Sequence, residues 1–190
     1  QNYKMGIDIG STTVKVVVIN HKNNILFQQY KRHFSEIKNT VANLLQEARE
    51  KLGNISFSAM LTGSGGVSIA KSLEIPFIQE VVATAKAIET AAPKTDVAIE
   101  LGGEDAKIIY FSNGIEQRMN GVCAGGTGSF IDQMASLLQT DASGLNELAK
   151  KHKVIYPIAS RCGVFAKTDI QPLINEGAAK EDLAVSIFQA

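Results

Sequence analysis

The sequence predicts an α/β protein made of two repeated lobes with a cleft between the copies. Short β-branched runs separated by polar turns alternate with segments of helical periodicity. A pattern of strand, acidic residue, glycine, strand, turn and strand occurs twice, about ninety residues apart, as in a duplicated unit. After its three strands the second copy becomes helical, so the two copies are alike at their starts and differ toward their ends.

The first lobe is assigned to residues 1–92 and begins with an antiparallel meander joined by tight turns. A helix follows, because Ile37, Val41, Leu44 and Ala48 recur at helical spacing. A fourth strand then runs into a glycine-rich loop. In order, the elements expected are strands over 3–10, 14–20 and 25–31, a helix over 36–51, a strand over 56–62, a short helix, a strand-like stretch at 76–78 and a helix over 80–91.

The second lobe is assigned to residues 93–190, after the boundary segment Ala91-Ala92-Pro93-Lys94-Thr95. The last helix carries no stop signal, so the second lobe is expected to be incomplete at its C-terminus and the chain to be a fragment. Gln1 is not a natural initiator, which indicates a trimmed or tag-derived start. The elements expected are strands over 96–101, 106–111 and 115–119 and helices over 127–138, 144–151, 164–175 and from 181 onward.

Composition excludes several classes of function. The 190 residues are 45% apolar, and nineteen basic residues balance nineteen acidic ones. No basic run predicts nucleic-acid binding, and no apolar stretch is long enough to span a bilayer. The start lacks the apolar region of a signal peptide, and two cysteines do not make a disulfide scaffold. The expectation is a cytoplasmic protein with a core of ordinary size.

Two glycine hairpins are the candidate phosphate sites. The first is Asp8-Ile9-Gly10-Ser11-Thr12-Thr13-Val14-Lys15, whose backbone N–H groups and hydroxyls can form a nest for phosphate oxygens. Asp8 can hold Mg²⁺, through water because Mg²⁺ dehydrates reluctantly. The second runs from Glu100 through Gly102, Gly103 and Asp105 to Lys107. Taken alone, either loop is better explained as an ordinary turn. Two at matching places favour phosphoryl transfer, and because no P-loop motif occurs, ATP would be held in another way.

Cys123 and Cys162 are the only cysteines. A free cysteine is most often a small buried hydrophobic residue. Here each precedes an expected helix, whose N-terminus favours negative charge such as a thiolate or an anionic cluster. If both bind metal, they supply half of a four-thiolate iron–sulfur site, and a second copy on a twofold axis supplies the rest. Zinc is the weaker alternative, because the spacing lacks a C-x₂-C knuckle.

Three further groups of residues are weaker candidates. His21, His33 and His152 fall in polar turns or helix ends and are expected to be solvated. The segment Thr62-Gly63-Ser64-Gly65-Gly66 fits a nucleotide contact and a helix-start loop equally well. The segment Gly125-Gly126-Thr127-Gly128 can line the cleft as well as shape the cysteine loop.

These motifs resemble a known family. The hairpins Gly6-Ile-Asp8-Ile-Gly10-Ser11-Thr12 and Leu101-Gly102-Gly103-x-Asp105-Ala106-Lys107 are similar to the two phosphate motifs of the acetate kinase, sugar kinase, Hsp70 and actin superfamily. The segments Cys123-Ala-Gly-Gly-Thr127-Gly128-x-Phe130 and Cys162-x-Val-Phe165-Ala166 narrow the resemblance to the activator ATPases of 2-hydroxyacyl-CoA dehydratases and benzoyl-CoA reductases, the BadF/BadG/BcrA/BcrD type.

The resemblance implies duplicated RNase H-like lobes of the actin-like ATPase fold, with ATP and Mg²⁺ in the interlobe cleft. It further implies a homodimer sharing one oxygen-sensitive [4Fe–4S] cluster through Cys123 and Cys162. ATP hydrolysis would drive one low-potential electron from ferredoxin or flavodoxin to an acyl-CoA dehydratase or reductase. By similarity Asp8 and Asp105 are the metal or water acids. The nucleotide residues are Gly10, Ser11, Thr12, Thr13, Lys15, Gly102, Gly103, Gly125, Gly126 and Thr127.

The sequence also departs from the family pattern. Relatives usually carry Asp where Glu100 stands and Gln where Glu104 stands, and Ala83-Thr84 replaces a Cys-His pair. An extra negative charge at Glu104 would weaken phosphate binding or alter hydrolysis. Two alternatives therefore stay open: a small-molecule (sugar) kinase of the same superfamily, which needs a base in the cleft, and a non-catalytic ATP-binding module of a larger protein.

Overall fold

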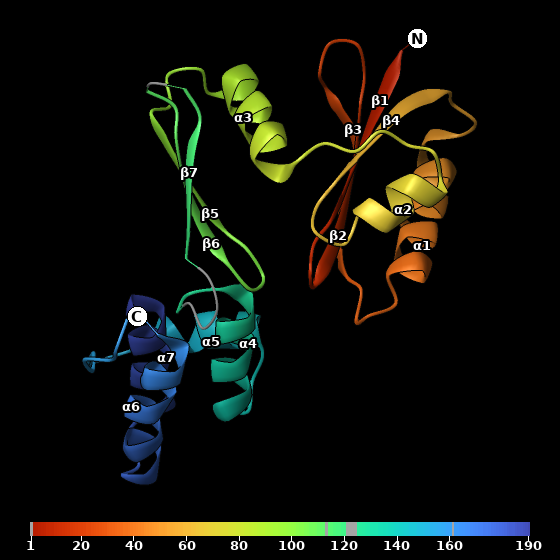
Figure 1. Ribbon diagram of the computed structural model, residues 1–190. Helices are drawn as coiled ribbons and strands as arrows, with labels where there is room; N and C mark the ends of the chain where they lie inside the picture. Colours follow the sequence, from red (N-terminus) through yellow and green to blue (C-terminus); the bar gives the residue numbers. More distant parts are fainter. Residues whose placement is uncertain (1, 113, 121–124, 161) are drawn as a thin grey trace. The chain divides into compact units, whose positions relative to one another are not determined.

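The chain folds into two compact units, residues 1–95 and 96–190 (Figure 1). The structure is a computed structural model that describes residues 2–112, 114–120, 125–160 and 162–190. Most helices and strands begin and end within two residues of their expected positions.

The first unit is built on a mixed sheet. β1 pairs antiparallel with β2 and parallel with β4, and β2 pairs antiparallel with β3, which confirms the predicted meander. The strand order is β3-β2-β1-β4. The strands are β1 (Tyr3–Ile9), β2 (Thr13–Ile19), β3 (Ile25–Arg32) and β4 (Phe57–Thr62).

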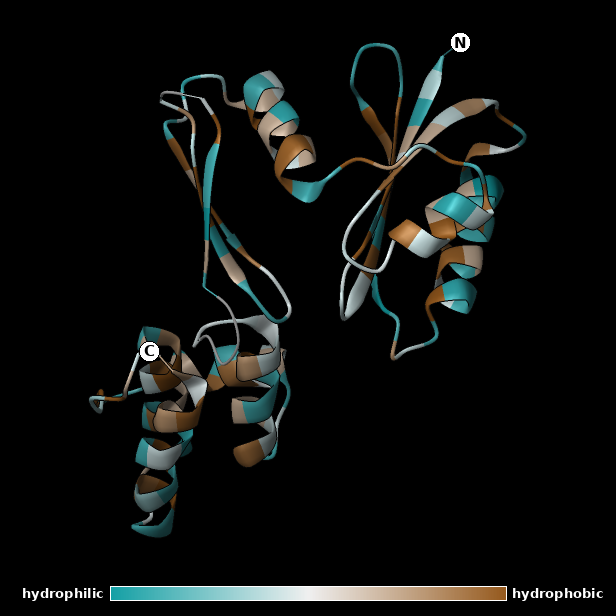
Figure 2. Ribbon diagram, viewed as in Figure 1, coloured by the Kyte–Doolittle hydropathy of each residue, from teal (hydrophilic) through white to brown (hydrophobic). Residues whose placement is uncertain are grey.

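One face of this sheet carries the core of the first unit. Successive side chains of a strand point to opposite faces, so every second residue of β1 and β2 is buried. Helix α1 (Ile37–Leu52) packs its apolar stripe of Val41, Leu44 and Ala48 into the same core. Figure 2 shows hydrophobic and hydrophilic segments both in these strands and along the helix, as expected for elements with one buried face.

Two shorter helices follow β4. They are α2 (Val67–Ser72) and α3 (Glu80–Ala91). The stretch at 76–78 is not a full strand, because only an isolated parallel bridge joins Phe77 to Leu61. The strand-like stretch expected here is thus reduced to one bridge. Two backbone hydrogen bonds hold it beside β4: Leu61 N–H donates to the Pro76 carbonyl, and Ile78 N–H donates to the Leu61 carbonyl.

The second unit contains an antiparallel sheet and a separate helical core. The sheet order is β5-β6-β7, formed by β5 (Val97–Leu101), β6 (Ala106–Tyr110) and β7 (Glu116–Asn120). Helices α4 (Gly128–Leu137), α5 (Ala142–Ala149), α6 (Gly163–Asn175) and α7 (Lys180–Gln189) follow. Their buried residues, among them Met134, Leu145, Ile170 and Leu183, pack on one another.

Candidate functional site

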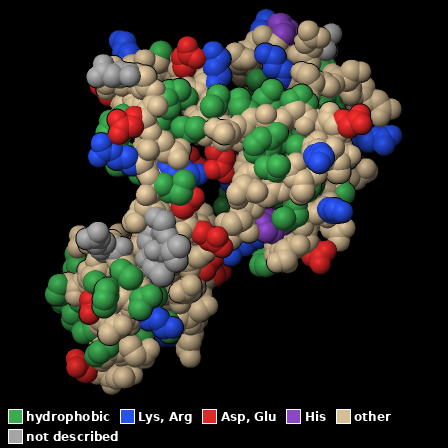
Figure 3. Space-filling model, viewed as in Figure 1, with side chains coloured by type: hydrophobic (Ala, Val, Ile, Leu, Met, Phe, Trp, Pro, Cys, Tyr) green, Lys and Arg blue, Asp and Glu red, His purple; other side chains and the backbone are tan. Residues whose placement is uncertain are grey.

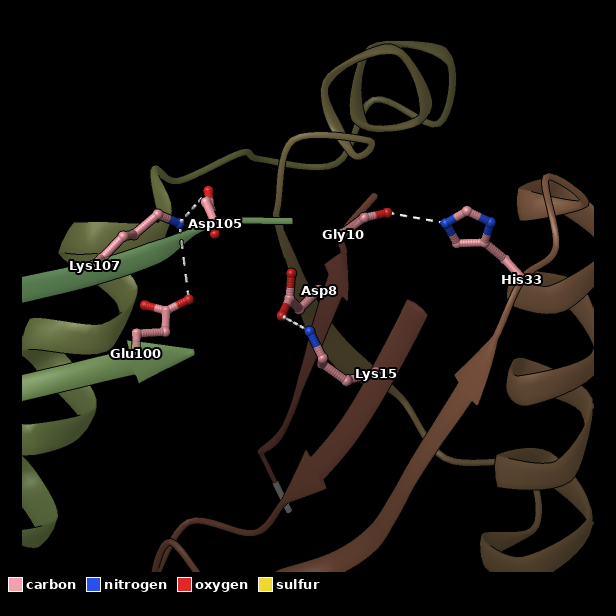
Figure 4. Close-up of polar contacts among 7 residues, drawn as sticks. All are labelled: Asp8, Gly10, Lys15, His33, Glu100, Asp105 and Lys107. Carbon is pink, nitrogen blue, oxygen red and sulfur yellow. Dashed lines mark hydrogen bonds and ion pairs between the residues drawn. The ribbon is translucent and has the colours of Figure 1, made fainter. Parts of the chain in front are cut away.

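The first glycine hairpin joins β1 to β2. Gly10 N–H donates to the Thr13 carbonyl at 2.9 Å, which closes the turn. Asp8 and Lys15 face each other across the two strands, and Lys15 Nζ lies 2.8 Å from Asp8 Oδ2 (Figure 4). Ser11 at the tip is exposed and Thr13 is buried. The loop thus presents a backbone turn beside one carboxylate–ammonium pair.

The second hairpin repeats this geometry between β5 and β6. Gly102 N–H donates to the Asp105 carbonyl at 2.8 Å. Lys107 Nζ lies 3.8 Å from Glu100 Oε1 and 3.7 Å from Asp105 Oδ2 (Figure 4). A Cβ on Gly102 would lie 2.6 Å from Asp105 Oδ1, so a side chain there would displace the Asp105 carboxylate.

The two hairpins correspond residue by residue. Each residue of the first lies 92 positions before its counterpart, from Asp8 to Glu100 and from Lys15 to Lys107. The turn hydrogen bond and the cross-strand carboxylate–lysine pair recur at that offset. A pair of ordinary turns has no reason to share both features, so the hairpins are copies of one motif.

Unpartnered oxygens mark where a cation fits. Among the described residues, the buried side-chain oxygens without a hydrogen-bond partner are Asp8 Oδ1, Thr62 Oγ1 and Glu100 Oε2. A buried carboxylate oxygen without a donor is unfavourable, and hard cations such as Mg²⁺ take oxygen ligands directly or through water. The residues around Asp8 therefore suit the Mg²⁺ that accompanies a nucleotide.

The third glycine-rich loop packs against the end of β1. Gly63 has φ +94°, and a Cβ there would lie 2.2 Å from the Ile9 carbonyl oxygen. Gly65 N–H donates to that same oxygen at 2.8 Å. Gly66 is the N-cap of α2, so the loop starts a helix and also lies beside Asp8, whose Oδ1 would be 2.6 Å from a Cβ on Gly63.

The start of α4 adjoins the second hairpin. Gly128 N–H donates to the Gly102 carbonyl at 3.0 Å, and Ser129 N–H to the Gly103 carbonyl at 2.7 Å. Thr127 is the buried N-cap of α4, and its hydroxyl accepts from Phe130 N at 3.4 Å. The structure thus brings the predicted residues Gly102, Gly103 and Thr127 together where the β5–β6 hairpin meets the start of α4.

Cys162 is the N-cap of α6, and its thiol is free and half-buried. Cys123 lies outside the described residues. Within the described part of the chain no three His, Cys, Asp or Glu side chains gather as a metal site. Two exposed apolar side chains, Val164 and Phe165, follow after Gly163. In Figure 3 hydrophobic side chains are visible on the surface of this helical part of the chain.

The segment before Cys162 is held by side chains of the neighbouring helices. Asp182 Oδ1 accepts from Lys153 N at 2.7 Å and from Val154 N at 3.0 Å. Ser186 Oγ accepts from Tyr156 N at 2.8 Å. The two backbone donors, that of Lys153 foremost, hold the pKa of Asp182 below its usual value. Helix α7 therefore sets the path of the chain toward Cys162.

Comparisons with known proteins agree with this geometry. The sequence matches the BadF/BadG/BcrA/BcrD ATPase family over residues 5–190. The chain belongs to the BadF/BadG/BcrA/BcrD ATPase family. It is 29% identical to the (R)-2-hydroxyglutaryl-CoA dehydratase activating ATPase of Acidaminococcus fermentans, over 99% of this chain and 74% of that protein. It is 28% identical to the 2-hydroxyisocaproyl-CoA dehydratase activator of Clostridioides difficile, over 97% of this chain and 71% of that protein.

Solved structures place the fold in the actin-like ATPase class. The activator of the 2-hydroxyisocaproyl-CoA dehydratase from Clostridium difficile, solved with bound ADPNP, superposes with a TM-score of 0.83 at 27% identity, over 97% of this chain and 70% of that one. The ethanolamine utilization protein EutJ from Carboxydothermus hydrogenoformans shares the fold at a TM-score of 0.56 and 16% identity, over 78% of this chain and 61% of that one. The predicted α/β fold is confirmed.

One prediction about this family member was wrong. His33 is not solvated: it is 6% exposed, and its Nε2 lies 3.0 Å from the Gly10 carbonyl oxygen. The prediction failed because the ring folds back from the end of β3 onto a loop 23 residues away, and no local pattern reports such a contact. His21 and His152 are exposed, as expected.

Sequence reasoning also missed a hollow of about 1040 Å³ on the open face of the first unit's sheet. The missing side chain of Gly6 leaves the floor open, and the small residues Ala83 and Ala87 of α3 line one side. Its polar lining includes Asp8, Lys15 and Thr62. The hollow thus runs from an apolar floor to the first hairpin of this ATPase. No described helix is long and apolar enough to cross a membrane.

Proposed function

We propose that this chain is the ATP-dependent activator of a 2-hydroxyacyl-CoA dehydratase or a related enzyme that acts on CoA substrates. The observation that carries the proposal is the repeated hairpin, with its turn and its carboxylate–lysine pair, in a chain of this ATPase family. Relatives at 28% and 29% identity are dehydratase activators by name.

The two hairpins hold the phosphate groups of ATP. Gly10, Ser11, Thr12 and Thr13 supply backbone N–H groups and hydroxyls, and Lys15 supplies positive charge. Gly102 and Gly103 do the same from the second copy, and Gly125, Gly126 and Thr127 come just before α4, whose first residues bond to the two glycine carbonyls. The glycines let phosphate approach the backbone closely.

Asp8 and Asp105 act on the metal and the attacking water. Asp8 keeps one oxygen on Lys15 and has the other free for hydrated Mg²⁺. Asp105 lies on the second hairpin and orients water for attack on the γ-phosphorus, as the bond to ADP breaks and phosphate leaves. Positioning and charge stabilisation supply the rate enhancement, since the protein forms no covalent bond to phosphate.

Cys162 and Cys123 would hold a [4Fe–4S] cluster together with the same pair from a second copy. The N-terminus of α6 stabilises a thiolate at Cys162, because unpaired N–H groups there favour negative charge. When bound, such a cluster supplies one electron at low potential. Ferredoxin or flavodoxin is oxidised by one electron, and the dehydratase or reductase is reduced by one.

Iron and sulfide analysis with a visible spectrum tests the electron-transfer part, on full-length protein purified without oxygen. The expected result is about four iron per dimer and a broad absorbance near ~400 nm. Cys162→Ala and Cys123→Ala should both lose iron and colour, and Ser160→Ala is the matched control that should retain them. A colourless protein that converts ATP to ADP only with an added sugar, and transfers the phosphoryl group to a hydroxyl of that sugar, would instead establish the kinase alternative.

A further inference from the structure

His33 is bound at both ring nitrogens by backbone groups of the first unit. It follows β3 directly and is 6% exposed. Ser35 N–H donates to Nδ1 at 3.1 Å, and Nε2 lies 3.0 Å from the Gly10 carbonyl oxygen (Figure 4). Because Nδ1 is an acceptor, the neutral ring carries its proton on Nε2, which donates to Gly10.

The backbone next to His33 is strained. Phe34 has φ +45° and Ser35 has φ +68°, both in the left-handed region that disfavours residues with a Cβ. Phe34 is 79% exposed and regains nothing by burial. The strained turn brings Ser35 N–H back onto Nδ1, so it sets the orientation of the ring.

His33 controls two peptide units of the phosphate hairpin. Its ring donates to the Gly10 carbonyl, and its backbone N–H donates to the Thr12 carbonyl at 3.1 Å. In a trans peptide the C=O and the following N–H point in opposite directions. Holding the Gly10 carbonyl on the His33 side therefore turns the N–H of Ser11 away from His33, at the exposed tip of the loop.

In the second hairpin a different donor holds the equivalent carbonyl. The counterpart of Gly10 is Gly102, whose carbonyl accepts from Gly128 N–H at 3.0 Å. In the third strands the offset is 89, because Tyr30 pairs with Lys15 and Met119 pairs with Lys107, so the position equivalent to His33 lies outside the described residues. In both copies a donor therefore holds this one carbonyl, from a helix start in one unit and from a histidine in the other.

We propose that His33 is a positioning residue for nucleotide phosphate: its Nε2–H holds the Gly10 carbonyl so that the Ser11 N–H points toward a phosphate oxygen. The proposal rests on the proposed function, since it needs ATP to bind at this hairpin. A histidine that only fills space would contribute to folding and leave phosphate recognition unchanged.

The test compares affinities for ATP·Mg²⁺ and for adenosine in the full-length protein. His33→Leu fills similar space without a donor, and His33→Gln restores an N–H that can reach Gly10. His33→Leu should weaken ATP about tenfold, in line with one lost hydrogen bond of about 1.4 kcal/mol. Adenosine affinity should stay within about twofold, and His33→Gln should recover most of the ATP affinity. His21→Leu, at an exposed histidine, is the control.

The outcomes distinguish a failure of the proposed function from a failure of the role of His33. If wild-type protein binds no ATP, the proposed function fails and the role of His33 fails with it. If wild type binds ATP and His33→Leu binds it equally, or loses adenosine to the same degree, only the positioning role is refuted. Should His33→Leu not fold, His33→Asn replaces it, because its shorter amide cannot reach Gly10; equal ATP affinities for His33→Asn and His33→Gln would then overturn the proposal.

Discussion

Strands β1 and β5 carry apolar residues at the same positions of the repeat, but only those of β1 are buried. The inward residues of β1 are at most 4% exposed, whereas their counterparts 92 positions later in β5 are at least 43% exposed. The three pairs are Met5 and Val97, Ile7 and Ile99, and Ile9 and Leu101.

The difference comes from what surrounds each strand. In the first unit β1 lies between β2 and β4, and α1 covers the apolar face. In the second unit β5 is an edge strand of the described sheet, and the described helices α4 to α7 pack on one another. The hairpin turn is nonetheless the same in both. Local sequence thus determines the turn, and neighbouring elements determine burial.

The largest effect is expected at Ile9, which is buried, compared with its exposed counterpart Leu101. Ile9→Ala should lower the free energy of unfolding of the first unit by about 2–5 kcal/mol, because it leaves a cavity in a packed core. Leu101→Ala, the matched change, should stay within about 0.5 kcal/mol. Chemical denaturation of the 190-residue chain measures both. Equal losses would show that another surface covers β5 in solution.

Two glycines with positive φ extend the contrast. Gly63→Ala should lower stability by about 3 kcal/mol, because a Cβ meets the Ile9 carbonyl oxygen at 2.2 Å in addition to the φ strain. Gly114 in the second unit has φ +101°, and an added Cβ there would meet no other atom. Gly114→Ala should therefore lower the free energy of unfolding by only about 1–2 kcal/mol. Thermal unfolding distinguishes them. A smaller loss for Gly63→Ala than for Gly114→Ala would contradict the packing of the 63–66 loop on β1.

The two lysines sharpen the comparison at the hairpins. The Lys107 side chain is 6% exposed and faces Glu100 and Asp105, whose side chains are 36% exposed, so Lys107→Met removes a buried cation from between two carboxylates and should lower stability by about 1–3 kcal/mol. The side chains of Lys15 and Asp8 are 41% and 32% exposed, and water replaces the lost partner. Lys15→Met should therefore change stability by about 1 kcal/mol or less. Urea titrations of the two variants decide; the reverse order would refute the assigned burial.

The smallest effect concerns the helical part of the second unit and depends on pH. Because the folded-state pKa of Asp182 is lowered, its contribution to stability is present above the unfolded pKa of about 4 and is lost as the pH falls through the folded value. Asp182→Asn should therefore lower the Tm at pH 7. The difference in Tm between the variant and wild type should shrink as the pH falls below about 4. Glu181→Gln on the same helix is the control. A difference that does not depend on pH would rule out the charged form as the acceptor of the Lys153 and Val154 N–H groups.

The sequence by itself determined the elements, the repeat and the family. Alternation and helical periodicity are local properties, so strand and helix bounds followed from them, as did the glycines that the two turns require. The match at Gly10, Gly102 and the cysteine motifs carried the family assignment, and the roles of these residues stay proposals that the experiments above address.

Only the tertiary structure decided what lies beside each element. Pairing of β1 with β4, the contact of His33 with Gly10, the hold of Asp182 on the segment before Cys162 and the exposure of β5 all join residues far apart in the chain. Periodicity records which face of an element is apolar, but not which surface meets it. A histidine after a strand and an apolar run on an edge therefore look the same in the sequence whether they are covered or open, because burial depends on the neighbours that the fold supplies.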